Sequence, residues 1–92
     1  MKNLTMFYLS DCGYCIKAFR ALEELYMENP IYREIPINKI EESKRPDIAD
    51  RYDYYAVPSF FDGNEKLFEA HLFMSYEDIR DEVRRVLETA LT

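Results

Sequence analysis

The pattern of hydrophobic and polar residues along the chain predicts short strands and helices in alternation. Residues 4–10 (LTMFYLS) are apolar on both faces and rich in strand formers, which is typical of a central parallel strand. From Cys15 onward, apolar residues recur at helical spacing until the ENP sequence at 28–30 ends the pattern. Residues 31–37 (IYREIPI) predict a weaker strand, and Pro36 places it at a sheet edge because proline cannot donate to a ladder.

The middle of the chain predicts a short helix followed by a hairpin. Residues 45–53 (RPDIADRYD) fit a helix with Pro46 in its first turn. Residues 57–72 contain two strand-like runs around the Asp-Gly-Asn triplet at 62–64, which is a good signal for a turn between antiparallel strands.

A last helix is predicted for residues 75–91. Ser75 and Asp78 resemble a capping box at its start. The stripe expected to be buried consists of Ile79, Val83, Val86, Leu87 and Ala90. The predicted order is therefore β-α-β-α-β-β-α, an α/β fold with a four-stranded mixed sheet and three helices.

Composition limits the classes of function. The chain has 92 residues, 48% of them hydrophobic and 33% charged, which suits one domain spanning residues 1–92. Its 12 basic and 18 acidic residues give a net charge of -6, which makes nucleic acid and anionic membranes poor partners. The first apolar run is too short for a signal sequence, and no stretch approaches the length of a membrane span. We expect a soluble, cytoplasmic monomer.

The only two cysteines, Cys12 and Cys15, lie where the first strand gives way to the first helix. A reducing cytosol keeps ordinary thiols reduced, so this pair favours a redox or metal role over a permanent structural disulfide. A helix N-terminus stabilises a thiolate through its unpaired N–H groups and the positive end of its dipole. Cys12 lies at that position, whereas Cys15 continues the apolar stripe of the helix. We expect Cys12 to attack a disulfide and a buried Cys15 to resolve the mixed disulfide.

Residues around the cysteines are expected to tune this chemistry. Gly13 and Tyr14 set the geometry of the turn between the two thiols. The carboxylate of Asp11 disfavours the Cys12 thiolate, and the positive charges of Lys17 and Arg20 partly offset it.

Together, the CxxC at a helix start, Val57-Pro58 about forty residues later, the hairpin and the closing helix resemble the thioredoxin fold in its smaller, glutaredoxin-like form. The resemblance covers nearly the whole chain. It implies a cis Val57-Pro58 bond facing the cysteines, which leaves the Val57 backbone free to pair with a bound substrate strand. Gly13, Tyr14, Val57 and Pro58 are accordingly the expected substrate-binding residues.

The chain departs from both branches that it resembles. Relative to glutaredoxins, Leu9 replaces a basic residue, Ala56 replaces a threonine, and the segment EAHLFMSYED lacks the glycine pair that helps to hold glutathione. Relative to thioredoxins, Asp11 replaces a tryptophan and Met6 replaces a buried aspartate, yet the segment before Val57 is thioredoxin-like. The protein therefore looks like a hybrid of the two.

The functional hypothesis is a thiol–disulfide oxidoreductase that acts on protein or small-molecule disulfides and receives electrons from an upstream reductase. We expect no resident cofactor, and we expect protein disulfides to be presented to an apolar rim of Tyr14, Tyr55 and Phe73. One alternative is a glutathione-dependent glutaredoxin. A second is a carrier that holds a glutathione-ligated [2Fe–2S] cluster, since CGYC resembles the motif of such carriers. A mononuclear zinc site or a cysteine pair without function would leave Val57-Pro58 unexplained.

Overall fold

A computed structural model describes residues 1–92. Its elements, in chain order, are β1 (Leu4–Tyr8), α1 (Gly13–Glu28), the 3-10 helix η1 (Pro30–Glu34), β2 (Ile37–Glu41), α2 (Pro46–Ala49), β3 (Ser59–Asp62), β4 (Glu65–Glu69) and α3 (Tyr76–Leu91). The predicted order of strands and α-helices is confirmed.

The four strands form one mixed sheet in the order β2-β1-β3-β4. β1 is parallel to β2 and antiparallel to β3, and β3 and β4 form the predicted antiparallel hairpin. β1 therefore lies in the middle of the sheet, as its two-sided apolar sequence predicts.

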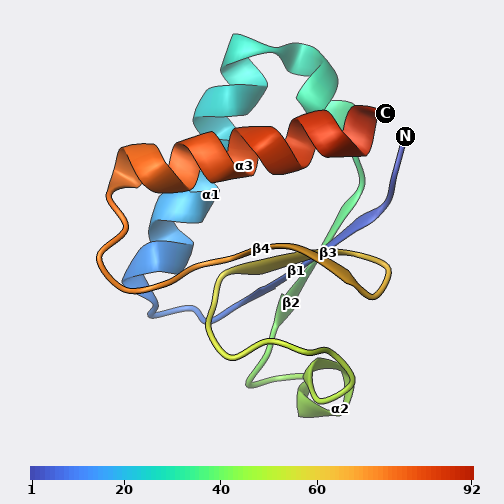
Figure 1. The fold of residues 1–92 in the computed structure, drawn as a ribbon, viewed down its shortest axis with the longest axis vertical. Coiled ribbons are helices and arrows are strands. Elements are labelled where there is room, and N and C mark those ends of the chain that lie inside the picture. Colours follow the sequence, from blue (N-terminus) through green and yellow to red (C-terminus); the bar gives the residue numbers. More distant parts are fainter.

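Helices cover both faces of the sheet (Figure 1). α1 and α3 lie on one face over the main core, to which the predicted stripe of α3 contributes five fully buried side chains. On the other face, Phe7, Ile40 and Phe61 form a smaller cluster beneath α2 and the segment that follows it. No helix combines the length and the apolar character needed to cross a membrane.

The strand predicted at 31–37 is wrong in its position. Pro30–Glu34 form a 3-10 helix, and the strand runs from Ile37 to Glu41. The apolar residues that suggested a strand serve the core instead, because Tyr32 and Ile35 are buried there and the Tyr32 hydroxyl donates to Glu88 of α3.

β2 carries little pattern of its own, since Asn38 and Lys39 are exposed. It is defined by its parallel pairing with β1, from Leu4 opposite Ile37 to Tyr8 opposite Glu41. β2 is an edge strand, as predicted, but Pro36 lies just before it and contributes only its carbonyl, which accepts from the Leu4 N–H at 2.8 Å.

α3 begins with the predicted capping box. The Ser75 hydroxyl accepts from the Asp78 N–H at 3.0 Å, and the Asp78 carboxylate accepts from the Ser75 N–H at the same distance. Both bonds satisfy N–H groups that the helix itself leaves without partners. The start of α3 is therefore fixed close to the end of the hairpin.

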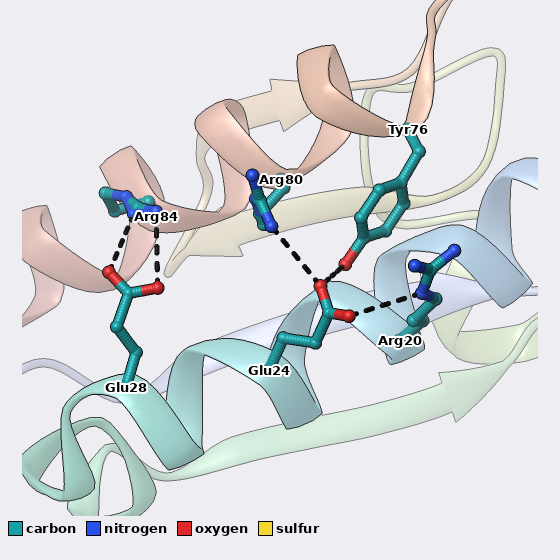
Figure 2. Close-up of polar contacts among 6 residues, drawn as sticks. All are labelled: Arg20, Glu24, Glu28, Tyr76, Arg80 and Arg84. Atoms are coloured by element: carbon teal, nitrogen blue, oxygen red, sulfur yellow. Dashed lines mark hydrogen bonds and ion pairs between the residues drawn. The ribbon is translucent and has the colours of Figure 1, made fainter.

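Polar contacts join the outer sides of α1 and α3 (Figure 2). At their centre, the Glu24 carboxylate accepts from the Tyr76 hydroxyl and pairs with Arg80 at 3.4 Å. The Tyr76 hydroxyl, helped by neighbouring arginines, lowers the pKa of Glu24. Because these groups are largely solvated, the apolar core rather than this network supplies most of the stability that holds α1 in place.

Candidate active site

Cys12 is the N-cap residue of α1. Its Sγ accepts a hydrogen bond from the Cys15 N–H at 3.2 Å, and its carbonyl accepts from the Ile16 N–H at 3.0 Å. The Cys12 side chain is partly exposed. Its sulfur therefore lies against the positive end of a sixteen-residue helix while remaining within reach of another molecule.

Cys15 lies one turn further along α1 and is only 1% exposed, which confirms its predicted burial. Burial, together with a hydrogen bond from the Cys15 thiol to Cys12 and the negative charges of Cys12 and Glu42, raises the pKa of Cys15 to about 12. Both cysteines are free thiols. No group of three or more His, Cys, Asp or Glu side chains is placed to hold a metal ion.

The segment before β3, residues 53–58, faces the cysteines; we refer to it as the proline loop. The Val57-Pro58 bond is cis, as predicted. The Cys12 thiol donates to the Val57 carbonyl at a sulfur-to-oxygen distance of 3.6 Å, whereas the Val57 N–H has no hydrogen-bond partner within the chain. A free main-chain N–H thus lies next to the partly exposed thiol.

The proline loop is fastened to the sheet on both sides of Val57. The Ser59 hydroxyl donates to the Ala56 carbonyl at 2.6 Å, and the Ala70 N–H donates to the Pro58 carbonyl at 3.0 Å. The Val57 backbone is therefore held at a defined place opposite Cys12.

An apolar cavity of about 520 Å³ lies beside the proline loop. Six of its eight lining residues are hydrophobic, and the full lining is Tyr14, Tyr55, Ala56, Val57, Glu69, Ala70, His71 and Leu72. The cavity joins the CxxC turn, the proline loop and the end of β4, so a ligand seated in it would lie close to the Cys12 sulfur.

Phe73 stands next to this cavity in an unusual conformation. Its backbone φ is 70°, in the left-handed region that bulky residues rarely adopt, and its side chain is 94% exposed. The Tyr14 hydroxyl accepts from the Phe73 N–H at 2.8 Å, which ties this segment to the CxxC turn. Tyr14, Tyr55 and Phe73, the residues of the predicted rim, thus lie around one end of the molecule.

The three tyrosines of the RYDYYAVP segment have different roles. Tyr52 and Tyr54 pack their rings against Phe7, each at a centroid distance of 4.8 Å, in the smaller core cluster. Tyr55 is 93% exposed and lines the cavity. Only one of the three is therefore available to a substrate.

The residues expected to tune Cys12 make other contacts. The Lys17 ammonium lies 5.5 Å from the centre of the Tyr14 ring, and Asp11 forms no ion pair. Arg20 pairs with Glu24 and lies over the Tyr76 ring (Figure 2). Tuning by Asp11 and Lys17 stays a prediction.

One residue at the site, Glu69 at the end of β4, was missed from the sequence. Its carboxylate contacts the proline loop rather than solvent. In the sequence it is one of several acidic residues in an alternating hairpin, and no pattern marks it, because the main-chain groups that it binds lie more than ten positions away.

No protein-family model and no curated protein sequence matches the chain. Among solved structures, the chain is similar to thioredoxin 1 from Thermosipho africanus, with a TM-score of 0.58 and 15% identity over 98% of this chain and 99% of that one. It is also similar to the germline-specific thioredoxin Deadhead from Drosophila melanogaster, with a TM-score of 0.59 and 21% identity over 96% and 77% of the two chains. A mutant thioredoxin from Halobacterium salinarum gives a TM-score of 0.55 and 21% identity over 89% and 71%. The protein has the thioredoxin fold.

Proposed function

We propose that the protein is a thiol–disulfide oxidoreductase that reduces disulfides through Cys12 and Cys15. The observation that carries the proposal is the placement of the Cys12 sulfur at the N-terminus of α1, opposite the free Val57 N–H, with Cys15 buried one turn behind it. A thiolate is the attacking species in disulfide exchange, and a helix start favours it.

In the proposed reaction, the Cys12 thiolate attacks one sulfur of the substrate disulfide. A Cys12–substrate bond forms, the substrate S–S bond breaks, and the second substrate sulfur leaves as a thiolate. Cys15 then gives up its proton and attacks the Cys12 sulfur, which releases the first substrate sulfur. The substrate gains two electrons and two protons, and the protein is left with a Cys12–Cys15 disulfide that an external dithiol or reductase must reduce.

The high pKa of Cys15 suits the resolving role. A thiol whose pKa is raised to about 12 stays protonated at neutral pH, so it does not compete with Cys12 for substrate. The leaving substrate thiolate is a base formed next to the site and can accept the Cys15 proton. The two thiols are therefore suited to act in order.

We propose polypeptide disulfides as the substrate class. The apolar cavity and the exposed Tyr55 and Phe73 side chains match apolar side chains that flank a cysteine in a polypeptide. A backbone N–H such as that of Val57 can pair with an extended segment. Glutathione is a small anion, and a chain with a net charge of -6 attracts it poorly.

Reduction of insulin disulfides, with dithiothreitol as the electron source, tests the proposal. Cys12→Ser should lower the rate to that of dithiothreitol alone, because serine cannot form the mixed disulfide. Cys15→Ser should accumulate a covalent adduct on Cys12 that mass spectrometry detects. Ser10→Ala, an exposed change near the same turn, serves as the matched control and should keep the activity. Full activity of Cys12→Ser would refute the proposal.

The electron donor can be identified with the oxidised protein. Reduction is followed with glutathione in one arm and with NADPH and a thioredoxin reductase in the other. We propose the reductase as the donor, because the site offers few contacts for glutathione. The visible absorption spectrum of anaerobically purified protein tests the alternative role as a carrier of a glutathione-ligated [2Fe–2S] cluster.

A further inference from the structure

The carboxylate of Glu69 is inserted among main-chain groups of the proline loop. One oxygen accepts from the N–H groups of Tyr55 and Ala56 at 2.5 and 2.7 Å. The other oxygen accepts from the Lys66 ammonium at 2.7 Å. The Glu69 side chain is only 19% exposed, which is low for a glutamate at the end of an edge strand.

The Glu69 carboxylate is one of several contacts that hold the proline loop in place. The Lys66 ammonium also donates to the Asp53 carbonyl at 3.2 Å, so the same cluster holds the start of the loop. The contacts to Ser59 and Ala70 described above hold its end. The Val57 N–H is left without a partner and therefore open to a ligand.

The geometry of a peptide chain links Glu69 to that free N–H. Peptide groups are planar, and the Val57 N–H belongs to the same peptide group as the Ala56 carbonyl, so its direction is set by the Ser59 contact to that carbonyl and by the dihedral angles around Ala56. Glu69 holds the two preceding N–H groups on one side of the loop, and this limits the directions that the Val57 N–H can take. Two successive N–H groups that point at one oxygen also form an anion site, which Glu69 fills from within the chain.

The charge on Glu69 is maintained by its neighbours. Burial works against the ionised carboxylate, but the hydrogen bonds from Lys66 and from the Tyr55 and Ala56 N–H groups outweigh it and lower the pKa of Glu69. The hydrogen bond to the Glu69 carboxylate in turn raises the pKa of Lys66. The contact between them is therefore an ion pair at neutral pH.

We infer that Glu69 is a positioning residue of the active site: it aligns the Val57 N–H for main-chain pairing with an extended polypeptide substrate and keeps other anions off the two adjacent N–H groups. This inference rests on the proposed function. Glu69 should therefore affect the binding of polypeptide disulfides, and it should not affect the reactivity of the thiols.

The test compares two substrates in steady-state kinetics. Glu69→Ala should raise the KM for insulin about tenfold, the loss expected for one misaligned hydrogen bond, with kcat nearly unchanged. Reduction of 5,5′-dithiobis(2-nitrobenzoic acid), which has no peptide backbone to pair with Val57, should change less than about twofold. Glu65→Ala, an exposed change on the same strand, is the matched control and should affect neither substrate.

A second variant separates positioning from charge. Glu69→Gln combined with Lys66→Met keeps a neutral acceptor for the two N–H groups and removes the ammonium that an amide would face. This double variant should return the KM for insulin to within about threefold of that of the unaltered protein, because a neutral acceptor keeps most of each hydrogen bond. Lys66→Met alone controls for the lost contact to the Asp53 carbonyl and should leave the KM for insulin nearly unchanged. Failure of the rescue, when this control behaves as expected and the double variant keeps its thermal stability, would count against the inference.

Amide hydrogen exchange supplies a readout that does not depend on activity. In Glu69→Ala, the amides of Tyr55 and Ala56 should exchange at least about tenfold faster, while amides in the core of α3 stay protected. Unchanged exchange at both positions, or equal losses for the two disulfide substrates, would overturn the inference and leave the proposed function standing. If the unaltered protein reduced neither substrate, the proposed function would fail, whatever the exchange rates.

Discussion

Two regions of the molecule use the same residue types in opposite ways. The packed face, which is the core between the sheet and helices α1 and α3, buries its aromatic side chains, and Phe60 there is fully enclosed. The open end consists of Cys12, Tyr14, Tyr55, Leu72 and Phe73, and most of its apolar surface is in contact with solvent. Tyr55, Leu72 and Phe73 bury little surface in the core, so we propose that their exposed side chains form a surface for another molecule.

The two cysteines lie on opposite sides of this boundary. Cys15 belongs to the buried stripe of α1, whereas Cys12 is partly exposed at the open end. Because they are only three residues apart, one helical turn separates a reactive environment from an inert one. The four predictions below test how sharp this separation is.

The largest expected difference is in thiol alkylation. Because burial, helped by the contacts with Cys12 and Glu42, raises the pKa of Cys15 from 9.0 to about 12, its thiolate at neutral pH should be about a thousandfold scarcer than that of an ordinary thiol. Iodoacetamide should therefore modify Cys12 first in the reduced protein. In Cys12→Ser, alkylation of Cys15 should be very slow at pH 7 and should rise about tenfold per pH unit toward strongly alkaline pH. Modification of Cys15 before Cys12 would reverse the assigned roles.

Truncation of one aromatic side chain in each region should lower the unfolding free energy much more in the packed face than at the open end. Phe60→Ala removes a fully buried ring and should cost about 3–5 kcal/mol of unfolding free energy. Tyr55→Ala removes only an exposed ring and leaves the main-chain N–H at position 55 bonded to Glu69. The unfolding free energy should therefore change by less than about 0.5 kcal/mol. Urea unfolding followed by circular dichroism measures both. Similar losses for the two variants would mean that the open end is part of the structural core.

Glutathione binding should be weak. The Ser75 N–H is bonded to Asp78, and the Tyr55 and Ala56 N–H groups are bonded to Glu69, so these three main-chain donors are not open to glutathione. The loss of two charge-assisted contacts should weaken binding about a hundredfold or more. NMR titration of Cys15→Ser should therefore show no saturation at submillimolar glutathione. Saturable shifts centred on Val57 and Ser75 would favour the glutaredoxin alternative.

A smaller effect is expected from Phe73→Gly. Glycine adopts the left-handed conformation without strain, so the unfolding free energy should stay the same or rise by up to about 1 kcal/mol. The loss of the exposed ring should raise the KM for insulin about tenfold, because an apolar contact with the substrate is removed. Phe73→Ala, which keeps the backbone strain, is the control and should show the same KM without the gain in stability. An unchanged KM in both variants would exclude Phe73 from the binding surface.

Much of this architecture could be predicted from the sequence, because in these elements the buried residues recur at short, regular spacing along the chain. The α3 stripe, the two-sided apolar run of β1, the hairpin turn and the capping box each depend on residues close together in the sequence. The same holds for the CxxC at a helix start. The cis Val57-Pro58 bond was predicted through the resemblance to a family, and the structure contains it.

Long-range contacts determine the remaining features. The segment at 31–37 resembles a strand, yet Tyr32 and Ile35 are drawn into the core by contacts with the helices, and the polar β2 strand exists because β1 offers it a parallel edge. The adjacent tyrosines Tyr54 and Tyr55 point to opposite environments, which no composition distinguishes. Glu69 reaches main-chain groups more than ten residues away. A sequence pattern reports how consecutive residues share burial, but the partner of a strand, a ring or a carboxylate depends on which distant segments folding brings together.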